Sequence, residues 1–151
     1  GGATTLARGL AMGEYHNFAE YNPVHKVLIF GGGNGSHDLY KLDAKGKVTR
    51  LRKAPVELVV NFAIVTVDPV SGDYLVFSGK DGGAFYVYDV QTDTWTRQKG
   101  AEALFKNPYH YDKSAVGLTI AAPISTYGVV MFVKHRPEGQ AWVYLYKHAE
   151  R

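Results

Sequence analysis

Cysteine is absent from this 151-residue chain. Its absence excludes disulfide bridges, thiolate nucleophiles and zinc sites with cysteine ligands. A run of about 18 apolar residues is also missing, so the sequence predicts no membrane span. The net charge is only +3, from 17 basic and 14 acidic side chains. Such a small excess does not favour nucleic-acid binding, and a solvated outer strand accounts for the basic residues at 45–53.

Metal and phosphate sites also lack their usual patterns. The six histidines are dispersed and no two have ligand spacing, so we expect no metal and no cofactor. The glycine-rich run 31–37 lies between two predicted strands and lacks the Lys-Ser/Thr pair of a phosphate loop, so its glycines are interpreted as turn residues. The chain begins with Gly1 and Gly2 rather than Met or an apolar signal, which predicts a processed, excised or partially determined chain.

Glycine and tyrosine are abundant, with 17 and 11 residues, and together they predict many short strands joined by tight turns. The sequence also repeats itself. Asn-Pro-Val at 22–24 and Asp-Pro-Val at 68–70 each precede an apolar run that ends in Phe, and Tyr40 and Tyr86 have the same 46-residue separation. A third, more diverged copy contains Pro123. Equal spacing at two anchors indicates a structural repeat.

Each of the first two copies divides into four strands and the third into three. The expected strands are 16–21, 26–30, 38–42 and 47–51, then 62–67, 74–78, 84–90 and 94–97, and finally 116–121, 129–133 and 141–146. The second strand of a copy is apolar on both sides, which predicts that both faces of its sheet are covered. The fourth, outer strand of the third copy is missing.

This pattern resembles the kelch repeat, with a glycine pair after the second strand, an aromatic residue in the third and Trp in the fourth. The residues that carry the resemblance are Gly31, Gly32, Tyr40, Gly82, Gly83, Tyr86, Tyr88 and Trp95. The resemblance covers about residues 14–148, and galactose-oxidase-type propellers share the same blade. It implies an all-β fold, a partial β-propeller of about three four-stranded antiparallel blades, the last lacking its outer strand.

On this interpretation one domain contains an N-terminal extension or preceding outer strand (1–13), blade 1 (14–53), blade 2 (54–99), an inserted loop (100–113) and an incomplete blade 3 (114–151). The missing strand implies the C-terminal end of a propeller. Open blade faces need a partner, either the remaining blades of a parent propeller or a second copy of the chain. In a second copy, residues 3–7 would supply the missing strand by strand addition.

The resemblance implies that the loops joining one blade to the next and the loops joining the second strand to the third share one face, which we call the loop face. The candidate contact residues gather on this face. Glu14, Tyr15, His16 and Asn17 form a polar group at the start of an innermost strand, where position 62 of the next copy is apolar. A strand-end role, satisfying backbone groups, is the alternative for this group. The other candidates lie in the long connection around 107–113 and in the loops after the second strands: Tyr109, His110, Tyr111, His37, His135 and Arg136.

The sequence therefore favours a non-catalytic binding or assembly module that recognises a protein or a glycan through one loop face. The alternative is the C-terminal part of a propeller enzyme acting on carbohydrate, such as a polysaccharide lyase. His16 or His110 would then be the base, Tyr109 or Tyr111 the acid, and Arg136 would neutralise a uronate. The resemblance points to an extracellular or periplasmic location, while ligand and blade number stay open.

Overall fold

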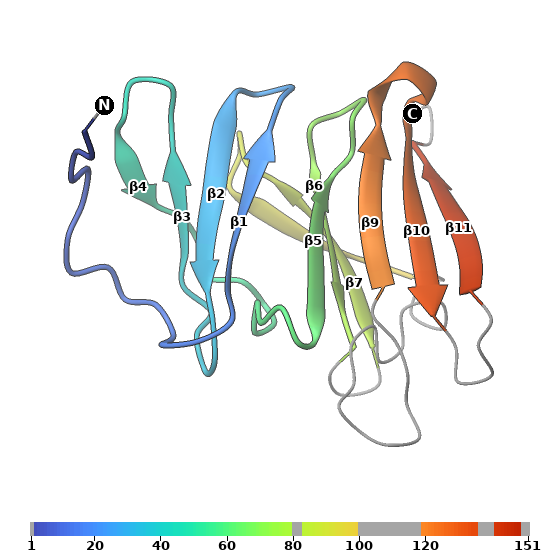
Figure 1. Cartoon of the computed structure of the whole chain (residues 1–151), viewed down its shortest axis with the longest axis horizontal. Coiled ribbons are helices and arrows are strands. Elements are labelled where there is room, and N and C mark those ends of the chain that lie inside the picture. Colours follow the sequence, from blue (N-terminus) through green and yellow to red (C-terminus); the bar gives the residue numbers. More distant parts are fainter. Residues whose placement is uncertain (1, 80–82, 100–118, 136–140, 149–151) are drawn as a thin grey trace.

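The computed structural model describes residues 2–79, 83–99, 119–135 and 141–148. In these residues the protein is all-β, without an α-helix, and its strands form three antiparallel sheets that stand side by side (Figure 1). The sheets contain four, four and three strands and do not close on themselves. No helix in the described ranges is long and apolar enough to cross a membrane.

The strands follow one another along the chain within each sheet. The first sheet contains β1 (Asn17–Asn22), β2 (Val27–Gly32), β3 (Leu39–Leu42) and β4 (Val48–Arg50). The second contains β5 (Ala63–Val67), β6 (Tyr74–Ser78), β7 (Ala84–Asp89) and β8 (Thr94–Gln98). The third contains β9 (Thr119–Ile124), β10 (Val129–His135) and β11 (Ala141–Lys147), with a short 3-10 helix η2 (Ser125–Tyr127) before β10.

The strands of the first two copies agree with the sequence expectation to within two residues at each end. The first strand of the third copy is described over Thr119–Ile124 and ends three residues past the expected position 121, and the expected strand residues 116–118 lie outside the described part of the chain. The other two strands of that copy are confirmed and begin at the expected positions 129 and 141.

The first hairpin of each full copy is closed by the same kind of hydrogen bond, from backbone N–H groups to a side-chain oxygen. The Oδ1 atom of Asn22 accepts hydrogen bonds from the backbone N–H groups of Val24 and His25, at 3.1 and 3.0 Å. In the second copy Oδ1 of Asp68 accepts from Val70 N–H at 2.9 Å. Such Asx turns explain why Asn or Asp stands before each repeated Pro-Val.

Strand β6 is the centre of the hydrophobic core, and all five of its residues are buried. Alternate side chains point to opposite faces of a strand. Tyr74 and Val76 therefore join a cluster shared with the first sheet, whereas Leu75 and Phe77 join one shared with the third. The prediction that both faces of this sheet are covered is confirmed.

The repeated aromatic residues pack within and between these sheets. Trp95 of β8 stacks on Tyr88 of β7, with ring centroids 4.4 Å apart, while Phe30 and Tyr40 stack at 5.6 Å in the first sheet. Phe77 meets Phe132 of the third sheet edge-on at 5.1 Å. Aromatic pairs of this kind contribute beyond the area that they bury.

The first strands of the three sheets, β1, β5 and β9, lie next to one another. The β1–β2, β3–β4 and β5–β6 turns share one end of the molecule, the upper end in Figure 1. The β2–β3 loop and the connection 51–62 from β4 to β5 share the other end, which we call the loop end. Residues 2–16 contain no strand and run beside the first sheet toward this end (Figure 1).

Candidate functional site

The polar group predicted at 14–17 lies at the loop end, where the chain enters β1. His16 adopts a left-handed backbone conformation with a φ of 61°, which few residues other than glycine adopt. Its Nδ1 atom lies 3.0 Å from Oδ1 of Asn34 in the β2–β3 loop and 3.4 Å from Nδ2 of Asn61 in the β4–β5 connection. Three segments thus meet at one imidazole. We call His16, Asn34 and Asn61 the His16 cluster.

Backbone hydrogen bonds hold these three segments together. Asn34 N–H donates to the carbonyl of Tyr15 at 3.0 Å, and Val60 N–H donates to the carbonyl of His16 at 3.2 Å. Gly33 N–H donates to the carbonyl of Leu58 at 2.9 Å. Side chains on segments fixed in this way are preorganised for binding, because little further ordering is needed when a ligand arrives.

Two glycines allow this close approach. A Cβ atom on Gly32 would lie 2.1 Å from the carbonyl oxygen of Leu58, and one on Gly33 would lie 2.8 Å from that of Tyr15. Both glycines have positive φ, of 64° and 92°. Gly31 and Gly32 are the last residues of β2, and the rest of the glycine-rich run forms a turn that leads into β3 rather than into a helix.

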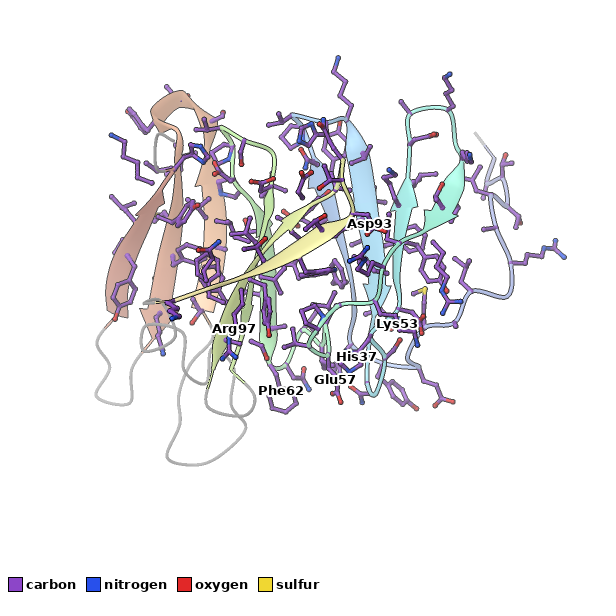
Figure 2. All side chains as sticks on the ribbon, turned by 180° about the vertical axis from the view of Figure 1, so that it is seen from behind. His37, Lys53, Glu57, Phe62, Asp93 and Arg97 are labelled. Carbon is purple, nitrogen blue, oxygen red and sulfur yellow. The ribbon has the colours of Figure 1, made fainter. Side chains whose placement is uncertain are left out.

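Two exposed aromatic rings accompany the His16 cluster. Tyr15, directly before His16, is 65% exposed, and Phe62, directly after Asn61, is 36% exposed. Figure 2 shows Phe62 at the loop end of the molecule. Phe62 is the 46-residue equivalent of His16, so the repeat places the two at corresponding entries to neighbouring sheets. Exposed aromatic rings beside fixed polar groups are typical of binding surfaces.

A groove of 480 Å³ begins beside the cluster at Asn17. It is lined by residues of β1, β5 and β9 and by the segment 58–60. Burial raises the pKa of Glu20 in this groove above its usual value. The hydroxyl of Thr119 is buried there and has no hydrogen-bond partner among the described residues. The groove is therefore mostly apolar, with a few polar groups along its walls.

His37 lies in a different cleft at the same end. This cleft of 310 Å³ lies between the loops of the loop end and the second sheet, and it is also lined by Glu57 and Arg97 (Figure 2). The Nδ1 atom of His37 lies 2.8 Å from the carbonyl oxygen of Ala54. Because a carbonyl oxygen only accepts, Nδ1 carries the proton and donates it there. The predicted loop-end position of His37 agrees with the structure, but His37 does not join the His16 cluster.

The other predicted contact residues have different positions. Glu14 is exposed, and Asn17 donates from Nδ2 to the carbonyl of Gly13 at 3.0 Å, a bond that closes the turn before β1. His135 is the last residue of β10, and its side chain lies outside the described part. Three tyrosine and histidine residues of the long connection and one arginine also lie outside it: Tyr109, His110, Tyr111 and Arg136.

Sequence reasoning singled out His16 but not its two asparagine partners, which come from the β2–β3 loop and the β4–β5 connection. For Asn61 the available signal was the equivalence of positions 16 and 62, which places their flanking segments together once the sheets stack. For Asn34 it was the pairing of β1 with β2, in which Asn17 lies opposite Gly32. Within the described residues no group of three or more histidine and acidic residues is arranged to hold a metal ion. The proton-transfer set of the lyase alternative has only His16 in the described part, so that alternative stays a prediction.

Comparison of the chain with protein-family models, with curated proteins and with solved structures finds no match. The site is therefore interpreted from its own geometry.

Proposed function

We propose that the chain is a non-catalytic binding module built from kelch-like propeller blades, and that it recognises a glycan at the His16 cluster. The propeller interpretation is supported by the 46-residue repeat, by three sheets whose first strands adjoin, and by loops that share one end. Loops on a rigid sheet scaffold are common places for ligand sites.

One observation carries the binding proposal: an imidazole and two side-chain amides from three separate segments meet, and exposed aromatic residues directly adjoin two of them in the chain. Each amide offers both a donor and an acceptor, which suits the paired hydroxyl groups of a sugar. The apolar faces of Tyr15 and Phe62 suit its C–H faces. The groove that starts at Asn17 provides room for a chain longer than one sugar unit.

The proposal is tested by screening the full chain against an array of neutral and acidic oligosaccharides and measuring the hits by calorimetry. Asn34→Ala and Asn61→Ala should each weaken binding about tenfold or more, because each removes a preorganised hydrogen-bonding group. His25→Ala is the matched control, since His25 lies in the β1–β2 turn at the opposite end. Failure of every oligosaccharide to bind, or equal affinity of the asparagine variants and the unmodified chain, would refute the glycan site.

A further inference from the structure

The third sheet has an apolar face that nothing in the described structure covers. In β10, Val130 and Phe132 point toward the second sheet, so Met131 and Val133 point away from it. The neighbouring strands continue this face: Ile120, Val143 and Leu145 are 64%, 62% and 66% exposed. We call Ile120, Met131, Val133, Val143 and Leu145 the outer apolar face.

Strand register shows which face of a blade this is. Tyr74 pairs with Tyr88 in the second sheet, and Val130 pairs with Tyr146 in the third. When these pairs are matched, the five residues of the outer apolar face correspond to five residues of the second sheet: Ile64, Leu75, Phe77, Phe85 and Val87. All five pack onto the third sheet. The outer apolar face is therefore the face that, in the preceding copy, receives another sheet.

The first sheet presents the complementary face. On the side away from the second sheet, the apolar residues of the first sheet have equivalents 46 positions later in the chain. These equivalents belong to the second sheet and pack against the first sheet. The residues of the first sheet are Tyr21, Leu28, Phe30, Tyr40 and Leu42, which we call the leading face. Tyr21 is 57% exposed. Part of the leading face is covered by the N-terminal segment, in which Ala11 exchanges hydrogen bonds with the Tyr40 hydroxyl.

We propose that the outer apolar face of one copy of this chain packs on the leading face of a second copy, so that two copies associate head to tail. The occupant is a second copy because both complementary faces occur on the same chain, and because their contact continues the two sheet-to-sheet interfaces already present within it. A head-to-tail contact generates either a closed ring or an open filament. Two copies closing on each other give a ring of six sheets, and docking displaces the segment around Ala11.

Sedimentation of the full chain over a wide concentration series tests the proposal, with a dimer as the expected species. Leu145→Asp, on the outer apolar face, and Tyr21→Asp, on the leading face, should each raise the dimer dissociation constant at least about tenfold. Both side chains are exposed in the single chain, so its fold tolerates the changes. Val143→Asp repeats the first test at a second position. Thr96→Asp, at an exposed position of β8 in the middle sheet, is the control.

Mixing the two variants separates the proposed geometry from a symmetric one. The Leu145→Asp chain keeps its leading face, and the Tyr21→Asp chain keeps its outer apolar face. An equal mixture should therefore form dimers at concentrations at which each variant alone is monomeric. A monomer at every concentration would overturn the proposal. So would a dimer that Leu145→Asp abolishes and Tyr21→Asp leaves intact, because two outer apolar faces would then pack together.

Discussion

The Nδ1 atom of His148 lies 2.6 Å from Oδ2 of Asp68, whose side chain is only 1% exposed. His148 follows the last strand of the third sheet, and Asp68 shapes the first turn of the second. The same carboxylate accepts hydrogen bonds from Val70 N–H at 2.9 Å and from the Ser71 hydroxyl at 3.1 Å. One buried carboxylate therefore closes a hairpin and also joins two sheets.

Replacing Asp68 tests how these two roles divide. Asp68→Ala should lower the free energy of unfolding by about 2–3 kcal/mol, because it removes the partner of three partly buried hydrogen-bonding groups, those of Val70, Ser71 and His148. Asp68→Asn introduces the residue type that the first copy has at position 22 and keeps the turn, so it should lower the free energy of unfolding by only about 1 kcal/mol. Urea unfolding of both variants measures the difference. Equal losses would mean that the bond to His148, and not the turn, dominates.

Gly32 and Gly35 form a matched pair for the loop end. Both have positive φ, at 64° and 70°, but a Cβ on Gly32 meets the Leu58 carbonyl whereas one on Gly35 has open space around it. Gly35→Ala should therefore cost only the backbone strain, about 1–2 kcal/mol. Gly32→Ala must also separate two backbone segments, and we expect a loss of about 4 kcal/mol or more.

Thermal and urea unfolding of the two glycine variants provides the measurement. If both variants lose the same stability, the contact between Gly32 and the β4–β5 connection is not tight. The His16 cluster is then not preorganised by this contact.

The strands were predictable because their signals are local. Alternating apolar residues, the Pro-Val turns and the aromatic third strand fix each hairpin within a few residues. The burial of β6 followed from its continuous apolar run. The partners of His16 were not predictable in this way, since Asn34 is 18 residues away and Asn61 is 45. The pairing of β1 with β2, in which Asn17 lies opposite Gly32, brings Asn34 beside His16, and only the stacking of the second sheet on the first brings Asn61 there.

The ion pair of Asp38 predicts a specific acid sensitivity. The hydrogen bond from Arg50, with further attraction from Lys53, holds the pKa of the Asp38 carboxyl below its usual 3.8. Because the pKa is lower in the folded than in the unfolded chain, the carboxylate stabilises the fold fully above 3.8, and this contribution is lost as the pH falls toward the folded value. Asp38→Asn should therefore be less stable near neutral pH and should lose less on acidification.

Urea midpoints measured between about pH 6 and pH 2 give this comparison. Glu14→Gln removes an exposed carboxylate and is the control. If the Asp38→Asn and unmodified curves run parallel throughout the acid range, the pair with Arg50 does not stabilise the fold.

Replacing His16 with glycine should affect glycan binding without a large effect on stability. Its left-handed φ of 61° costs about 1–2 kcal/mol in a residue other than glycine. His16→Gly relieves this strain, gives up the contacts of the ring with Asn34 and Asn61, and adds about 0.4–1 kcal/mol of unfolded-chain entropy. We expect its free energy of unfolding to stay within about 1 kcal/mol of the unmodified chain, while glycan binding is lost.

Lys26→Gly is the matched control, because Lys26 has a φ of 55° in the β1–β2 turn at the opposite end. The second copy already places glycine at the equivalent position 72, with a φ of 77°. Lys26→Gly should be at least as stable as the unmodified chain and should bind glycan unchanged. Urea unfolding and calorimetry on the same preparations measure both properties. A His16→Gly variant that binds as well as the Lys26→Gly variant would show that the imidazole shapes the entry to β1 without touching the ligand.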